Sequence, residues 1–168
     1  MKLYFSGFSL QNEEGLFQEY LETSDFVVSG FSFGAIKAVE YVLETTKRVD
    51  KLQLFSPAYF NDKEKKYKRM QLLYFTKDSA QYCEQFLQNV GFSKELASEY
   101  FEQGTYAELE ELLEYFWDEK KLQKIVDKNI KIEVFLGAND KIIDASKALE
   151  FFKQFAEVYY IKNKGHIL

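Results

Sequence analysis

Gly30-Phe31-Ser32-Phe33-Gly34 is the most informative stretch of this sequence, because it has the pattern G-x-S-x-G. It follows a short apolar run at residues 25–29 and precedes a helical pattern over residues 35–42. Between a strand and a helix, this pattern predicts a sharp turn that strains the serine backbone and exposes its oxygen above the carboxyl edge of a sheet. Ser32 is therefore the candidate nucleophile.

The base for this serine is the next candidate. A serine becomes a good nucleophile beside a base, most often histidine, and His166 is the only histidine in the chain. Residues 158–161 have the pattern of a strand, and residues 163–165 form a short turn that would place His166 at the end of that strand. A solvated histidine in the tail is the alternative, but the need of Ser32 for a partner favours His166 as the base.

The acid of a catalytic triad is expected between the serine and the histidine in the chain. Residues 131–137 form a buried-strand pattern, and Asp140 follows in the next loop, where its carboxylate could orient His166. A loop aspartate is more commonly a turn or cap residue. Asp144 is the competing acid, but it better fits the N-terminal cap of a helix over Ala145–Phe155. We therefore prefer Asp140.

Acyl transfer also needs donors for the oxyanion. The backbone N–H after the nucleophile, that of Phe33, is one candidate. The second donor should come from the loop after an earlier strand, where Ser6-Gly7-Phe8 leaves the strand Lys2–Phe5. Enzymes with this motif often carry His-Gly at this place, and Ser6 departs from that pattern. The Phe8 N–H is the candidate second donor.

Composition narrows the class of protein. With 168 residues the chain is most simply one domain, and its net charge of −5 argues against general nucleic-acid binding. No run approaches the ~20 apolar residues of a membrane span. One histidine and the single Cys83 cannot supply a zinc site, so no metal or cofactor is expected. A lone cysteine also fits a reducing cytoplasm.

Strand and helix patterns alternate, which predicts an α/β fold with a parallel sheet whose two faces are covered by helices. The helices are expected near Asn12–Glu22, from Phe33 to about Thr46, and over Ala145–Phe155. Residues 58–129 show only helical periodicity with many aromatics, which predicts a helical lid over the carboxyl edge of the sheet. The five expected strands are Lys2–Phe5, Phe26–Ser29, Lys51–Phe55, Lys131–Leu136 and Glu157–Ile161.

The lid contains a basic run whose default interpretation is a solvated helix face. It is also the candidate docking patch for an acidic partner, because opposite charge speeds encounter and fixes orientation. The residues concerned are Lys63, Lys65, Lys66, Lys68 and Arg69.

Together these motifs resemble a shortened α/β-hydrolase with about five parallel strands. The opening residues 4–8, the elbow at 28–38, residues 54–57 and residues 131–140 are similar to the compact BioV-type pimeloyl-acyl-carrier-protein methyl ester esterases of bacterial biotin synthesis. The resemblance implies a triad of Ser32, Asp140 and His166. It also implies that the substrate is a methyl-pimeloyl chain on acyl carrier protein.

Two other functions fit the same sequence. A general carboxylesterase or thioesterase would share the triad and differ only in the lid. A catalytically degenerate hydrolase could serve as a binding module, which the small size and Ser6 allow.

Overall fold

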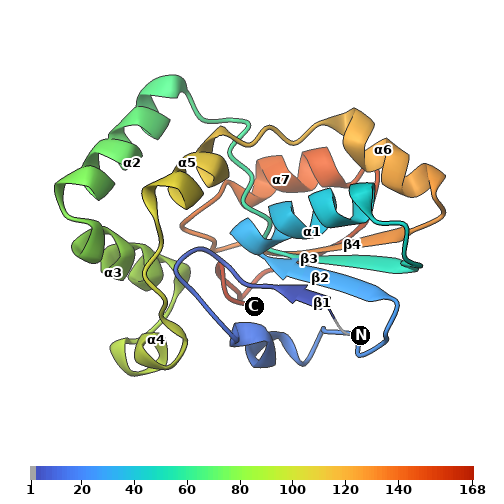
Figure 1. The fold of residues 1–168 in the computed structure, drawn as a ribbon, viewed down its shortest axis with the longest axis horizontal. Helices are drawn as coiled ribbons and strands as arrows, with labels where there is room; N and C mark the ends of the chain where they lie inside the picture. The colour runs from blue at the N-terminus through green and yellow to red at the C-terminus, as the bar shows by residue number, and fades with distance from the viewer. Residues whose placement is uncertain (1–2) are drawn as a thin grey trace.

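The computed structural model describes residues 3–168, so the predicted strand residue Lys2 lies outside the described part. A single parallel sheet has the strand order β1-β2-β3-β4-β5 (Figure 1). All five predicted strands are present, and each differs from its predicted bounds by two residues or fewer. Their bounds are Leu3–Phe5 (β1), Val27–Phe31 (β2), Lys51–Phe55 (β3), Lys131–Gly137 (β4) and Glu157–Ile161 (β5).

Three α-helices lie on one face of the sheet (Figure 1). They are α1 (Phe33–Glu44), α6 (Glu119–Asp127) and α7 (Ala145–Phe152). α1 packs on β1, β2 and β3, whereas α6 and α7 pack on β4. The aliphatic side chains beneath them alternate along the strands, as a half-buried sheet face requires, and include Val28, Leu52, Leu54, Ile132 and Val134.

The other face has no α-helix among the described residues, although helices were expected on both faces. The helix expected near Asn12–Glu22 is only a 3₁₀ turn, η1 (Glu13–Phe17). The Gln53 side chain holds the segment that follows η1. Its oxygen accepts the Glu22 N–H at 2.9 Å, and its amide donates to the Tyr20 carbonyl at 3.0 Å.

A row of aromatic rings replaces the missing helices on this face. Phe31, Phe55, Phe135 and Tyr159 are in register on four neighbouring strands. The Phe55 and Phe135 rings stack at 5.1 Å, and the Phe135 and Tyr159 rings at 4.8 Å. Phe17 of η1 stacks on Phe55 at 4.9 Å. Such rings bury a large apolar area per residue, so they and Phe17 cover the middle of this face, whereas Tyr159 on β5 remains 39% exposed.

Between β3 and β4 the chain forms five helices, and they divide into two groups. α6 packs on α1 and β4 and so belongs to the sheet. The others stand at the end of the molecule (Figure 1), and below the word lid denotes these four helices alone. They are α2 (Lys65–Lys77), α3 (Ser79–Val90), α4 (Lys94–Tyr100) and α5 (Tyr106–Glu114).

Candidate active site

Ser32 lies at the turn between β2 and α1. Its backbone has φ 54° and ψ −113°, a conformation that L-residues rarely adopt and that costs about 1–3 kcal/mol. Neighbouring strands hold this turn: the Ser32 N–H donates to the Phe55 carbonyl at 2.9 Å, and the Ser32 carbonyl accepts the Ala58 N–H at 3.1 Å. The strain is therefore maintained by hydrogen bonds to the end of β3 and to the loop after it.

The two glycines of the elbow are required by backbone contacts. A Cβ on Gly30 would lie 2.2 Å from the Gly34 carbonyl oxygen, and a Cβ on Gly34 would lie 1.9 Å from the Phe5 carbonyl oxygen. No side chain fits at such distances. The glycines thus allow α1 to start directly against β1 and the loop after it.

His166 faces Ser32, with 2.8 Å between His166 Nε2 and Ser32 Oγ. The backbone of this histidine is held at two points. Ser56, which follows β3, donates its hydroxyl to the His166 carbonyl at 2.6 Å. The Ile167 N–H donates to the Val90 carbonyl of α3 at 3.3 Å. The histidine is thus fixed to both the sheet and the lid.

Asp140 completes the contact series at 2.6 Å from His166 Nδ1. Its other carboxylate oxygen accepts the N–H groups of Ile142 and Ile143 at 2.7 and 2.9 Å. With Nδ1–H donating to Asp140, Nε2 is left to accept the Ser32 hydroxyl proton. Asp144, the alternative acid, instead accepts the Lys147 N–H at 3.0 Å and caps α7.

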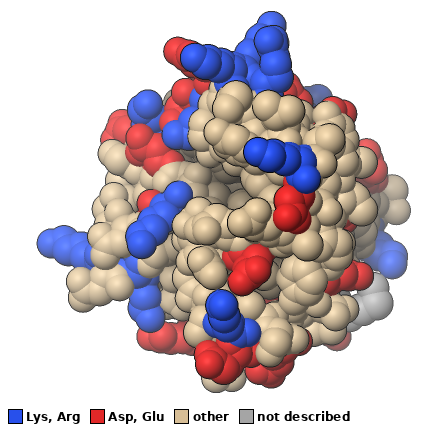
Figure 2. All heavy atoms as spheres, turned by 90° about the vertical axis from the view of Figure 1, so that its left-hand side faces the viewer, with Lys and Arg blue, Asp and Glu red and all other residues tan. Residues whose placement is uncertain are grey.

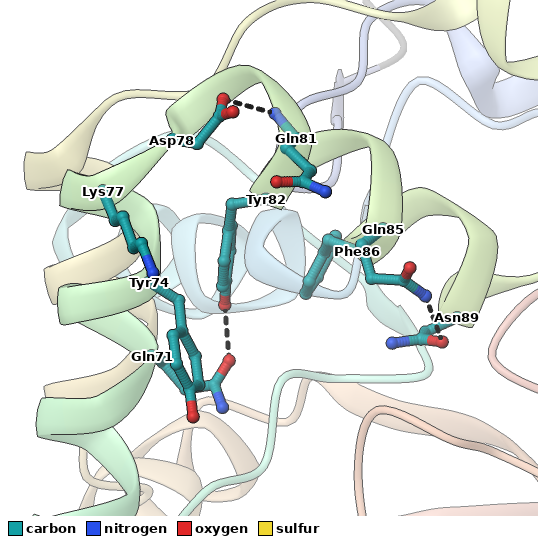
Figure 3. Close-up of a pocket in the computed structure, with 9 residues that line it drawn as sticks. All are labelled: Gln71, Tyr74, Lys77, Asp78, Gln81, Tyr82, Gln85, Phe86 and Asn89. Carbon is teal, nitrogen blue, oxygen red and sulfur yellow. Dashed lines mark hydrogen bonds between the residues drawn. The ribbon is translucent and has the colours of Figure 1, made fainter.

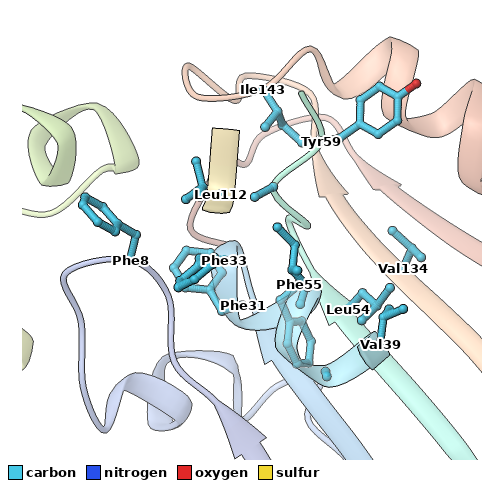
Figure 4. Packing of buried hydrophobic residues seen from close by; sticks show 14 of the residues in the cluster. Phe8, Phe31, Phe33, Val39, Leu54, Phe55, Tyr59, Leu112, Val134 and Ile143 are labelled. Carbon is cyan, nitrogen blue, oxygen red and sulfur yellow. The ribbon is translucent and has the colours of Figure 1, made fainter. Parts of the chain in front are cut away.

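The loop after β1 carries the candidate donor Phe8. The N–H groups of Phe8 and Phe33 donate to no acceptor within residues 3–168. The Phe8 ring packs edge-on against Phe86 of α3 at 5.2 Å. The next residue, Ser9, bonds to the lid, because its hydroxyl donates to Cys83 Sγ of α3 at 3.1 Å, and it also accepts the N–H of Gly104 between α4 and α5 at 3.1 Å. The loop is therefore held between the elbow and the lid (Figure 4).

Glu13 on η1 is the site-adjacent residue that sequence reasoning missed. It has no exposed surface, and its Oε1 accepts the Gly7 N–H at 2.8 Å and the Tyr4 O–H at 3.0 Å. Burial, and the adjacent Glu13 carboxylate, raise the pKa of Tyr4, which keeps the phenol protonated as a donor. In the sequence, Glu13 precedes a second glutamate in a polar stretch, and nothing there marks it as buried.

The reacting groups are closed off from solvent. Ser32 is 2% exposed and His166 is 1% exposed. A hydroxyl at the end of a strand, hydrogen-bonded to a buried imidazole, suits nucleophilic attack in a site without bulk water. A substrate can reach Ser32 only when the covering segments move.

The lid has a groove of its own between α2 and α3 (Figure 3). This cavity of about 500 Å³ is lined mainly by carboxamide and aromatic side chains. Two of them, Tyr82 and Gln71, are hydrogen-bonded at 2.8 Å across the helices. Phe86 lines the same groove and contacts Phe8, so the groove leads toward the loop after β1.

The basic run lies at the start of α2, and basic side chains gather at that end of the lid face (Figure 2). Lys65, Lys66 and Arg69 are exposed and, among the described residues, have no carboxylate partner. Lys68 is half-buried. Lys63 differs, because it is paired with Asp62 at 3.4 Å.

Within residues 3–168 no cluster of histidine, cysteine, aspartate or glutamate has the arrangement of a metal site. No helix in that range is both long and apolar enough to cross a membrane. Cys83 is buried in α3 and receives the Ser9 hydroxyl at 3.1 Å.

Comparison with known proteins gives structural matches only. No family model and no curated protein matches this sequence. An esterase from Exiguobacterium antarcticum superposes with a TM-score of 0.62 at 14% identity, over 83% of this chain and 59% of the esterase. The chain likewise covers 58% of a hydrolase from Oleispira antarctica, with a TM-score of 0.60 at 15% identity over 84% of this chain.

Other similar structures match along nearly the whole chain. BioG from Haemophilus influenzae superposes with a TM-score of 0.61 at 14% identity, over 99% of this chain and 88% of BioG. E-2-(acetamidomethylene)succinate hydrolase gives a TM-score of 0.62 at 10% identity, over 99% of this chain and 84% of that protein. These matches confirm the predicted fold class: the chain has a compact α/β-hydrolase fold.

Proposed function

We propose, on the premise of this α/β-hydrolase fold, that the chain is a serine esterase. The observation that carries the proposal is the series of contacts from Ser32 through His166 to Asp140, at 2.8 and 2.6 Å. The strained backbone of Ser32 supports the same interpretation, because strain of this kind is characteristic of a nucleophile elbow.

The reaction follows from these groups. Ser32 Oγ attacks the ester carbonyl carbon while His166 Nε2 takes the hydroxyl proton, and the Phe8 and Phe33 N–H groups stabilise the oxyanion. The ester C–O bond breaks and His166 returns the proton to the departing alcohol. Water, deprotonated by His166, then attacks the acyl-enzyme, and the carboxylate leaves as Ser32 recovers its proton. Asp140 stabilises the imidazolium throughout.

We further propose that the substrate is the methyl ester of a pimeloyl chain on acyl carrier protein. The motif resemblance supports this substrate, as does the match to BioG over nearly the whole chain. Hydrolysis would release methanol and free the pimeloyl carboxylate. The enzyme must then spare the thioester that joins the chain to its carrier, and a lid that receives the chain in one direction is a suitable device.

The first experiment is incubation with methyl-pimeloyl acyl carrier protein, with Ser32→Ala in parallel, followed by intact mass measurement of the carrier. Loss of one CH₂ with the acyl chain retained, only when Ser32 is present, is the expected result. Loss of the whole chain would make the protein a thioesterase. Cleavage of aryl esters alone would indicate a general carboxylesterase, and no activity at all would support the binding module.

We propose that the exposed cations at the start of α2 dock the acidic carrier. Lys65→Glu with Lys66→Glu should raise KM for the carrier-bound substrate and leave kcat unchanged. Exposed charges at the edge of an interface change the rate at which the two proteins associate, not the chemical step. Lys120→Glu with Lys124→Glu on α6 is the matched control, with the same charge change on another helix. An effect equal to that of the control, or a KM that does not change with salt in the wild type, would refute the patch.

A further inference from the structure

Glu13 is a buried charged residue for which the triad gives no role. One carboxylate oxygen accepts the Gly7 N–H at 2.8 Å and the Tyr4 O–H at 3.0 Å. The other oxygen is buried and has no hydrogen-bond partner among the described residues. A buried carboxylate with one oxygen unsatisfied is costly to keep. It therefore suggests a role other than stability.

The two hydrogen bonds of Gly7 define the direction of the Phe8 N–H. Glu13 holds the Gly7 N–H, and the Gly7 carbonyl accepts the Leu10 N–H at 3.2 Å. In a planar trans peptide the carbonyl and the following N–H point in opposite directions. Fixing Gly7 on both sides thus fixes the donor of Phe8, which has no acceptor within residues 3–168.

Within residues 3–168, Glu13 is the side chain that hydrogen-bonds the Gly7 side of this loop. The Ser6 hydroxyl makes no hydrogen bond there. On the other side of Phe8 the loop is held by the Phe86 ring against that of Phe8 and by the Glu102 N–H, which donates to the Ser9 carbonyl at 3.1 Å. On the Gly7 side, the side-chain restraint comes from Glu13.

We propose that Glu13 is the positioning residue of the oxyanion site: by holding the Gly7 N–H, its carboxylate aims the Phe8 N–H at the oxygen that becomes negative when Ser32 attacks. The inference rests on the proposed esterase function. It assigns the support of the loop after β1 to an acidic side chain on η1.

The test compares Glu13→Met and Glu13→Gln with Glu14→Gln, a matched change at the next residue. Methionine keeps the buried volume and removes both the acceptor and the unpaired charge, whereas glutamine keeps a neutral acceptor. The readouts are kcat and KM for p-nitrophenyl acetate, the inhibition constant of a trifluoromethyl ketone that forms a tetrahedral adduct with the serine, and the melting temperature.

Loss of one oxyanion donor costs roughly 10²-fold in kcat, and Glu13→Met should approach this value with KM unchanged. The inhibition constant of the trifluoromethyl ketone should rise by a similar factor. Glu13→Gln should recover most of kcat, losing only a few-fold because a neutral acceptor is weaker. Glu14→Gln should match the wild type. If Glu13 only stabilised the fold, its substitution would lower the melting temperature without lowering kcat at an unchanged KM.

Wild-type kcat in Glu13→Met, or a loss confined to KM, would overturn the inference. If Glu13→Met does not fold, Glu13→Gln decides alone: a kcat equal to that of Glu14→Gln would refute the role. Ser32→Ala, measured beside them, separates the two proposals. Activity that survives in Ser32→Ala would refute the esterase function itself, whereas its loss leaves only Glu13 in question.

Discussion

α1 on the sheet and α2 in the lid are helices of similar length that bury very different fractions of their residues. α1 has 12 residues and buries seven of them. α2 has 13 residues and buries only Phe75, and α4 buries none. Segments with few buried contacts open at a lower free-energy cost than segments packed in the core. The difference assigns the fixed geometry to α1 and the sheet beneath it, and makes α2 and α4 the parts of the lid expected to move.

This division suits a buried nucleophile. Ser32, His166 and Asp140 all follow strands of the same sheet, so lid motion need not disturb their mutual distances. The oxyanion loop and the tail after His166 are both hydrogen-bonded to the lid or to the segments that connect its helices. Substitutions in the sheet should therefore affect chemistry or folding strongly, and substitutions in the lid should affect substrate capture.

The largest expected effect tests whether the chemistry lies entirely in the sheet. Asp140→Asn should lower kcat by roughly 10³–10⁴-fold, because the amide favours the wrong tautomer of His166. Asp144→Asn is the matched control, since asparagine also caps helices. It should keep kcat near that of the wild type, measured on an aryl ester. Equal losses in the two variants would contradict the assignment of Asp140.

Gly34→Ala tests the contact between α1 and β1. Its Cβ would lie 1.9 Å from the Phe5 carbonyl oxygen, so either the helix or the strand must shift. Overpacking of a core contact costs typically 1–3 kcal/mol, and this backbone contact should reach about 3 kcal/mol or more. Denaturant unfolding measures the loss. Gly15→Ala, where nothing lies within 4 Å of the added Cβ, should change stability little.

The parts of this protein that sequence reasoning could predict are those with a local signal. The strands are short apolar runs that alternate with helical patterns, and the elbow has fixed spacing, so Ser32 and the parallel sheet could be predicted. His166 and Asp140 followed from being residues of the right type at strand ends. The structure brings all three together, and their catalytic role remains the proposal tested above.

Glu13 and the aromatic row required three-dimensional information. Glu13 is buried only because η1 folds back over the sheet, and its neighbour Glu14 has the same local sequence environment. Phe31 and Phe55 end their strands and Phe135 lies two residues before the end of β4, but their alignment depends on register, which arises from pairing between distant segments. The lid predicted over residues 58–129 also included α6, which has the same helical periodicity as its neighbours but packs on the sheet.

Leu168→Ala tests the junction where the tail after His166 meets the lid. The Leu168 side chain is buried in the core cluster, so its truncation should cost about 2 kcal/mol or more and lower kcat a few-fold as His166 loosens. Leu73→Ala on α2 is the matched control, because this leucine is 58% exposed. Its melting temperature and kcat should equal those of the wild type. An equal loss in Leu73→Ala would show that the lid is more rigid than its burial indicates.

The smallest expected effect concerns a polar pair on the helix-free face, where the Gln53 side-chain amide donates to the Glu133 carboxylate at 3.0 Å. Burial raises the pKa of Glu133. Hydrogen bonds from Gln53, Lys131 and Lys51 outweigh burial, so the net pKa of Glu133 lies below its usual value.

A carboxylate whose folded pKa is depressed stabilises the fold above the unfolded pKa and loses that contribution as the pH falls through the folded pKa. Glu133→Gln should therefore melt below the wild type at pH 7, and the difference should shrink once the pH falls below the ordinary glutamate pKa of about 4.3. Glu150→Gln, which breaks an exposed pair with Lys153, should show no resolvable difference at either pH. A difference that persists at low pH would mean that Glu133 acts through packing, and that this face is closed by its aromatic row without help from charge.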